Sequence, residues 1–252
     1  MFRPRIIPVL LLKDKGLVKT VRFKKPVYIG DPINAVKIFN DMEADELVFL
    51  DITATSENRG PSVEVISKIG DEAFMPFAVG GGIRSAADVK QIINAGAEKV
   101  VINTAACHTP NVVADAAYAA GSQSVIVCID VKKNIFGKYV VMAANGKTST
   151  GKSPEKFAEE MAKLGAGEIM VNSIDQDGVM TGYDLTLIRS VASAVDVPVI
   201  ASGGAGILEH FAEAVKAGAN AVAAGSMFVF HGSRRGVLIN YPDRKNVENL
   251  FL

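Results

Sequence analysis

A repeat with a constant offset divides this chain into two similar halves. The segments that begin at Phe77 and Val199 read FAVGGGIRS and VIASGGAGI, and those that begin at Ala95 and Ala217 read AGAEKVVINT and AGANAVAAGS. Both pairs are 122 positions apart (77 to 199 and 95 to 217). Each copy holds an apolar run, a glycine-rich turn, a helical segment and a second apolar run, so the repeated unit is two βα units.

Apolar runs along the whole chain extend this pattern to eight strand–helix units. Each run has the length of a strand and is rich in Val, Ile and Leu, which is typical of parallel strands covered on both sides. Eight such units in 252 residues predict an α/β fold, a (β/α)8 TIM barrel built from two similar half-barrels. An open doubly wound sheet is the alternative, and the matching halves favour the closed barrel. The expected strands are Arg5–Leu12, Glu46–Asp51, Pro76–Val79, Lys99–Asn103, Ser124–Asp130, Glu168–Ser173, Pro198–Ala201 and Ala221–Ala224.

Local signals mark the starts of several helices. Asp31 and Ser153 each precede a proline, and proline suits the first position of a helix. The helix that begins after Ser153 is expected to run through Leu164. Ser85, with an acidic residue three positions later, resembles a capping box that opens a helix to Ala95.

Composition limits the classes of protein to which the chain can belong. No low-complexity linker interrupts it, so we expect a single domain over residues 1–252. The net charge is zero, which gives no basic footprint for nucleic acid. Neither a signal peptide nor an apolar run of about 18 residues is found, so no membrane association is expected. The two cysteines, Cys107 and Cys128, are too few for a disulfide framework and indicate a reducing, cytoplasmic setting. His108, His210 and His231 lack metal-ligand spacing, so neither metal nor cofactor is assigned.

Chemistry in a barrel lies where strands end and βα loops begin. The glycine-rich loops around Gly81 and Gly203 allow backbone N–H groups to surround an anion, so they predict a phosphate site at each end of one pocket. The alternative is that these glycines only permit tight turns. The other residues expected at strand ends are Leu11, Asp51, Asn103, Thr104, Asp130, Asn172, Ser173, Asp175, Gly225 and Ser226.

Five specific motifs suggest a family. They are DELVFLDITA from Asp45, VGGGI from Val79, GSQ from Gly121, GAGEI from Gly165 and IASGGAG from Ile200. From Arg5 to about Ser226 the chain resembles the HisF family, the cyclase subunits of imidazole glycerol phosphate synthase. The resemblance implies a barrel of two similar halves that pairs with a HisH-type glutaminase subunit and receives its ammonia. It also implies a bis-phosphorylated ribulosyl substrate and products that enter histidine and purine synthesis.

The resemblance also implies roles for individual residues. The family's catalytic aspartate after the fifth strand matches Asp130, whereas its second catalytic aspartate, after the first strand, falls on Leu11. A family threonine after the sixth strand is replaced by Asn172, and the C-terminal tail from Met227 departs from the amphipathic last helix of the family. Phosphate binding maps to Gly82, Asn103 and Thr104 in one half, and to Asp177, Gly178, Gly203, Gly204, Gly225 and Ser226 in the other.

Four charged residues open expected strands at the opposite end of the barrel. Arg5, Glu46, Lys99 and Glu168 match the family positions that form a gate for ammonia, and all four are intact. A ring of salt bridges that plugs the barrel base is the structural alternative. Their presence predicts that a glutaminase docks at the N-terminal face.

Several polar residues have a plainer interpretation beside the functional one. Asp130 could cap a helix, and Asp51 could support its loop. Asp175 is expected to form a turn before Gly178. Lys19 is expected in the loop after the first strand, either as a solvated lysine or as the match to a family loop residue. Cys128 is expected to be a small core residue rather than a nucleophile.

Leucine cannot transfer a proton, so Leu11 breaks the family's acid–base pair. Asp14, three residues on, is the alternative proton-transfer group. The sequence therefore favours a HisF-like paralogue that passes ammonia to another acceptor, and it resembles HisF-like proteins associated with amidating sugars for surface polysaccharide (lipopolysaccharide). The stretches PVLLLKD from Pro8 and FVFHG from Phe228 carry that likeness. The alternatives are a working cyclase in histidine biosynthesis, a non-catalytic scaffold that activates glutaminase, and a sugar-phosphate isomerase barrel.

Overall fold

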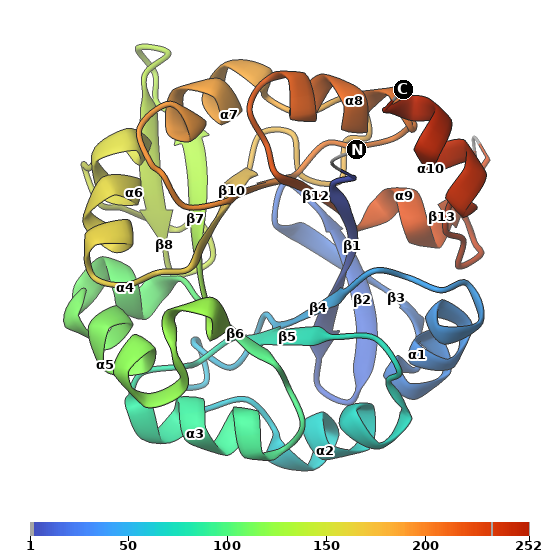
Figure 1. The fold of residues 1–252 in the computed structure, drawn as a ribbon, viewed down its shortest axis with the longest axis horizontal. Coiled ribbons are helices and arrows are strands. Elements are labelled where there is room, and N and C mark those ends of the chain that lie inside the picture. Colours follow the sequence, from blue (N-terminus) through green and yellow to red (C-terminus); the bar gives the residue numbers. More distant parts are fainter. Residues whose placement is uncertain (1–2, 233, 252) are drawn as a thin grey trace.

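The strands form a closed barrel that helices surround on the outside (Figure 1). The computed structural model describes residues 3–232 and 234–251. Neighbouring barrel strands are parallel, and pairing of β10 (Glu168–Ser173) with β7 (Val125–Lys133) closes the ring, so the predicted (β/α)8 fold is confirmed. The barrel strands are β1 (Arg5–Lys13), β4 (Leu47–Asp51), β5 (Phe77–Gly80), β6 (Lys99–Ile102), β7 (Val125–Lys133), β10 (Glu168–Ser173), β11 (Val199–Ser202) and β12 (Ala221–Ala224).

The helices follow the strands in chain order and cover the outer face of the barrel. No helix in the described part of the chain is long and apolar enough to cross a membrane. The outer helices are α1 (Pro32–Asp41), α2 (Val63–Glu72), α3 (Ala86–Asn94), α5 (Asn111–Ala120), α6 (Pro154–Lys163), α7 (Leu185–Ala192), α8 (Glu209–Lys216) and α10 (Arg244–Leu250). Shorter segments are α4 (Thr104–His108), η1 (Ser122–Ser124) and α9 (Ser226–Val229).

The expected caps are present, with one exception. The side chain of Asp31 accepts hydrogen bonds from the backbone N–H groups of Ile33 and Asn34, at 2.9 and 3.0 Å. Ser85 accepts from the N–H of Asp88 at 3.2 Å. Ser153 precedes α6 but makes no side-chain cap hydrogen bond, so the proline after it sets the start of that helix.

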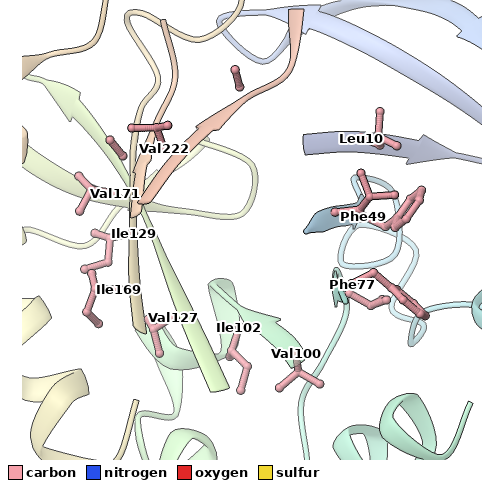
Figure 2. Close-up of a cluster of buried hydrophobic side chains, with 14 of the residues drawn as sticks. Leu10, Phe49, Phe77, Val100, Ile102, Val127, Ile129, Ile169, Val171 and Val222 are labelled. Atoms are coloured by element: carbon pink, nitrogen blue, oxygen red, sulfur yellow. The ribbon is translucent and has the colours of Figure 1, made fainter. Parts of the chain in front are cut away.

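Alternating side chains divide the core into two layers. In β1, Ile6 and Leu10 belong to the large cluster between strands and helices, whereas Ile7 and Val9 belong to a smaller cluster inside the barrel. Figure 2 shows part of the outer layer, with Phe49 and other labelled side chains on strands around the barrel. This two-residue period follows from strand geometry. It decides which residues can reach the barrel interior.

The segment after β1 differs from the expectation of a loop. It forms an antiparallel hairpin of β2 (Gly16–Val21) and β3 (Lys24–Gly30), and β2 pairs with the end of β1. Lys19 therefore lies on a strand, and the prediction that it belongs to a loop is wrong. Further strands outside the barrel are β8 (Tyr139–Ala143), β9 (Thr148–Ser149), β13 (Phe230–His231) and β14 (Gly236–Val237).

Candidate functional site

A cavity of about 500 Å³ opens at the carboxyl ends of the barrel strands. Its walls come from both halves of the chain, because residues of the loops after β5 and β6 face residues of the loops after β11 and β12. The strand-end positions singled out in the sequence thus meet in one place. Those that line it are Leu11, Asp51, Gly82, Asn103, Thr104, Asp130, Asn172, Asp177, Gly178, Gly203, Gly204, Gly225 and Ser226.

Asp130 is the buried acid of this cavity. It lies on β7 and is 8% exposed. Its Oδ2 accepts a hydrogen bond from Asn103 Nδ2 at 3.0 Å, and its Oδ1 accepts one from Asn172 Nδ2 at 2.9 Å. Burial raises the pKa of Asp130 to about 7, and the two amides partly oppose that rise. A carboxylic acid with a pKa near neutrality is suited to proton transfer.

Leu11 faces the same cavity from β1. Its neighbours in the sheet are Leu50 on β4 and Val18 on β2, and it packs with Leu50 against the apolar cluster inside the barrel. Asp14 is exposed in the turn that joins β1 and β2 and does not line the cavity. The structure therefore brings Leu11, and not Asp14, to the site.

Lys19 is a buried cation at the cavity wall, and the prediction of a solvated lysine is wrong. It is 5% exposed, and its Nζ donates a hydrogen bond to the carbonyl oxygen of Val9. Burial lowers its pKa to about 8, against the attraction of Asp177. Asp177 also lines the cavity, its Oδ2 accepts from Thr20 Oγ1 at 3.4 Å, and burial raises its pKa. The hairpin of β2 and β3 thus supplies a wall of the site.

Each of the two glycine-rich loops has a glycine with positive φ at the matched position. Gly82 has φ +72°, and its counterpart Gly204 has φ +122°. A Cβ at Gly82 would lie 2.1 Å from the carbonyl oxygen of Arg59, and one at Gly204 would lie 2.1 Å from that of Gly182. Both positions thus demand glycine for conformation and for space. Each loop keeps its backbone at the cavity wall, as anion binding requires.

The positions after β6 and β12 also match. Asn103 and Gly225 precede the short helices α4 and α9, neither has a side-chain cap hydrogen bond, and their φ and ψ values are −128° and −85° against −110° and −71°. Thr104 and Ser226 follow them at the cavity wall. The Thr104 hydroxyl accepts from the N–H of Ala144 at 3.2 Å.

Two aspartates near the site have structural partners. Asp51 Oδ1 accepts from the N–H groups of Thr53 and Ala54, both at 3.0 Å, and Asp51 Oδ2 lies 2.6 Å from Arg59 Nη1. Asp51 therefore supports its loop, which is the structural one of its two interpretations. Asp175 accepts through Oδ2 from the N–H of Lys133 at 3.0 Å. Its carboxylate thus holds the end of β7. The sequence predicted only a turn-forming role for Asp175 and not this contact.

Sequence reasoning missed several residues of the cavity wall, among them three with polar or charged side chains. Arg59, Arg84 and Asn145 all line it. Asn145 Nδ2 donates to the carbonyl oxygen of Ile52 at 2.8 Å. These residues lie in loops without a periodic pattern, so nothing in the sequence separates them from solvated side chains.

At the opposite end of the barrel the four strand-opening charges form a closed ring. Arg5 pairs with Glu46 and, at 2.7 Å, with Glu168. Lys99 Nζ lies 3.0 Å from Glu46 and 2.9 Å from Glu168. Glu46 is 2% exposed, so the ring joins alternating charges across the barrel interior. The predicted cluster is therefore assembled.

The cysteines and histidines form no further centre. Cys128 is buried inside the barrel, and burial raises its pKa well above the usual range, which disfavours the thiolate. Burial also raises the pKa of Cys107 to about 11. Over residues 3–232 and 234–251 no group of three or more His, Cys, Asp or Glu residues could hold a metal ion.

A family model and several similar proteins point to the same protein family. The family model described as "Histidine biosynthesis protein" matches residues 5–234. Similar proteins carry the name "Putative imidazole glycerol phosphate synthase subunit". The subunit hisF2 of Pseudomonas aeruginosa is 49% identical over 244 residues, which cover 96% of this chain and 97% of that protein. The subunit HisF of Leptospira borgpetersenii is 46% identical over 253 residues, 100% of both chains. The subunit hisF3 of Vibrio vulnificus is 45% identical over 247 residues, 96% of this chain and 94% of that protein.

Proposed function

The chain belongs to the histidine biosynthesis protein family, and we propose that it is a HisF-type synthase subunit of a glutamine amidotransferase complex. A HisH-type glutaminase docks at the N-terminal face of the barrel and releases ammonia into it. The chain passes this ammonia to an acceptor at the other face, and Leu11 leaves its own cyclase chemistry impaired. The acceptor we propose is a sugar derivative amidated for surface polysaccharide, in the cytoplasm, with residues 1–252 acting as one barrel.

The connection between the two faces supports ammonia transfer. Along β1, the inward positions are Arg5 in the charged ring, then Ile7 and Val9, then Leu11 at the cavity. From Arg5 to Leu11 is roughly 20 Å at about 3.3 Å per residue. The same order of charge, apolar residue and cavity residue recurs from Lys99 through Val101 to Asn103. An apolar interior suits neutral ammonia, because it disfavours the ammonium ion.

The single observation that carries the paralogue reading is Leu11 at the cavity wall. Cyclisation with cleavage needs one group that takes a proton and another that gives one, and leucine does neither. The loss of such a partner typically costs 10²- to 10⁴-fold in rate, or roughly 3–5 kcal/mol of barrier.

A working cyclase is the second candidate, and the retained phosphate loops favour it. Gly82 and Gly204 line one cavity with the residues after β6 and β12, so a substrate with a phosphate at each end fits both halves. Lys19 adds a buried proton-transfer group beside Leu11, with a pKa of about 8. In this reading Asp130 and Lys19 share the proton transfers.

The deciding experiment measures turnover of the bis-phosphorylated ribulosyl substrate with ammonium salts as the nitrogen source. This assay needs no glutaminase, so it reports on the barrel alone. We expect the parent chain to turn over slowly and Leu11→Asp to be faster by roughly 10²- to 10⁴-fold. Leu11→Asn is the matched control, because it introduces a side chain of the same shape that cannot ionise. It should not restore turnover.

Two outcomes would contradict the proposal. Fast turnover by the parent chain, unchanged by Leu11→Asp, would identify a working cyclase. A parent chain that fails to stimulate a HisH-type glutaminase, and whose charged-ring variant Lys99→Met fails in the same way, would remove the ammonia-transfer part of the proposal.

A further inference from the structure

Asn172 contacts Asp130 in an unusual way. It lies directly beside Asp130 in the pairing of β10 with β7 and is 8% exposed. Its Nδ2 donates to Asp130 Oδ1 at 2.9 Å. Its own Oδ1 is fully buried and is the one buried side-chain polar atom in the described chain that lacks a hydrogen-bond partner. A buried amide therefore makes one hydrogen bond to the carboxyl group and leaves its oxygen without a partner.

We infer that Asn172 is a positioning residue for Asp130, and that its amide holds the carboxylate as a proton acceptor turned toward the cavity. This inference rests on the proposed function in so far as Asp130 is the proton-transfer group of the site. Together with Asn103, Asn172 places one N–H donor on each carboxylate oxygen. Donors at both oxygens stabilise the ionised form, which has only acceptors. They disfavour the protonated form, which would have to point its hydrogen away from both amides.

The orientation of the Asn172 amide follows from the same reasoning. Turned the other way, its oxygen would face the carboxylate oxygen of Asp130, and the two would repel. The present orientation instead leaves Oδ1 against the backbone of Gly203, where a Cβ would lie 2.6 Å from it. Gly203 thus provides the space for an unpaired oxygen. An unpaired buried acceptor is normally destabilising, so packing alone does not explain an asparagine here.

Other groups around Asp130 act in both directions. Cys128 on the same strand has its Sγ 4.0 Å from Asp130 Oδ1, Cys107 lies on α4, and Asp177 in the loop after β10 carries a like charge. Lys19 on β2 is the cation at this wall, and its strongest charge partner is Asp177. Burial and Asp177 favour the neutral acid, whereas Asn172 and Asn103 oppose them. The two amides are therefore the groups that limit the rise in the pKa of Asp130.

The test is a direct titration of Asp130 by carbon-13 NMR of the full chain labelled at the aspartate carboxyl groups. The Asp130→Asn variant identifies the signal by its absence. We compare the parent chain with Asn172→Leu, which keeps the branched shape but removes both the donor and the unpaired oxygen. We expect the Asp130 midpoint to move upward by about half a unit or more. Urea unfolding of both proteins, measured alongside, establishes that the variant is folded.

Asn145→Leu is the matched control. Asn145 is another asparagine of the cavity wall, but its amide donates to a backbone carbonyl and not to Asp130. This variant should leave the Asp130 midpoint unchanged and lower the urea midpoint. Should Asn172→Leu fail to fold, Asn172→Ala removes the same donor without added bulk, and the same upward shift is expected.

An unchanged Asp130 midpoint in the folded Asn172 variant would overturn the inference, and a lowered urea midpoint with it would assign Asn172 to packing. The titration needs no substrate. A shift in Asp130 together with absent ammonia transfer would therefore reject the proposed function while it supports the role of Asn172.

Discussion

Replacement of Asp130 by asparagine tests the electrostatic character of the cavity in a single change. The carboxyl group of Asp130 is buried, and burial raises its pKa from 3.8 to about 7. The folded state binds this proton more tightly than the unfolded chain does. The folded state is therefore stabilised relative to the unfolded chain below pH 4, and this stabilisation is lost as the pH rises toward 7. Asp130→Asn removes the ionisation and should remove this part of the pH dependence.

The size of the effect follows from the shift. About three pKa units correspond to about 4 kcal/mol, at roughly 1.4 kcal/mol for each unit. The asparagine oxygen can accept from only one of the two flanking amides, Asn103 or Asn172, and the other loses its acceptor at a cost of about 1–3 kcal/mol. We therefore expect Asp130→Asn to be less stable than the parent near pH 4 by about 1–3 kcal/mol. Near pH 8 it should be more stable by a similar amount.

The assay is urea unfolding of both proteins at a series of pH values from about 4 to about 8. The difference between their free energies of unfolding removes contributions that the two share, so its change with pH reports on Asp130 alone. The reasoning is refuted if this difference stays constant over the range instead of changing by about 4 kcal/mol, the value that corresponds to the raised pKa.

Three further predictions use the same fold. Burial lowers the pKa of Lys19 from 10.5 to about 8, so the free energy of unfolding should rise between about pH 8 and pH 10.5, and Lys19→Met should remove this rise. Urea unfolding across that range measures the effect, and parallel pH curves for the two proteins would contradict it. Gly204→Ala should lower the free energy of unfolding by about 3 kcal/mol or more, because φ is positive and a Cβ would lie 2.1 Å from the carbonyl oxygen of Gly182. Thermal unfolding checks it, with Gly137→Ala as the control, since Gly137 also has a positive φ of +75° but a Cβ there would meet no atom within 4 Å. Glu46→Gln should destabilise the chain by about 1–3 kcal/mol, because the half-buried Arg5 and Lys99 each lose one of their two counter-charges and keep only Glu168. Equal stability of the two proteins in urea unfolding would show that the ring is not a coupled network.

The barrel was predictable because its determinants are local and repeated. Each parallel strand is an apolar run covered on both faces, so Val125–Lys133 and Glu168–Ser173 stand out from the helices between them. The internal repeat adds information that no single run contains, since two matching halves favour closure of the sheet. Ends of elements were less well determined. The strand expected to end at Asp130 continues to Lys133, because its partner there is β8 and not another barrel strand.

The hairpin of β2 and β3 was missed for a physical reason. The sequence of β2, GLVKTV, has the β-branched residues of a strand, but a lysine in the middle of it looks like a solvent-facing residue. Burial of Lys19 depends on the end of β1 with which β2 pairs, and on the carbonyl oxygen of Val9 that accepts a hydrogen bond from its Nζ. Such long-range partners are invisible in a single sequence.

The candidate site was predictable to the extent that it lies at strand ends. Topology alone brings those ends together, so Gly82, Asn103, Asp130 and Gly204 were expected to share one cavity and do so. Which loop residues join them was not predictable, as Arg59 illustrates, because side-chain direction in a loop depends on contacts formed elsewhere. The pairing of Arg59 with Asp51 at 2.6 Å is one such contact.

One alternation rule relates the charged ring to the cavity. Side chains two positions apart on a barrel strand face the same side, so the residue that opens a strand also fixes which later residues look inward. On β10 this rule leads from Glu168 through Met170 to Asn172, and on β1 it leads from Arg5 to Leu11. Leu11 therefore faces inward and is not an outward-facing core residue. A shift of β1 by one position would turn Leu11 outward, but it would also withdraw Arg5 from its pairs with the two glutamates. The intact ring thus argues that leucine occupies the inward position on β1 and faces the cavity.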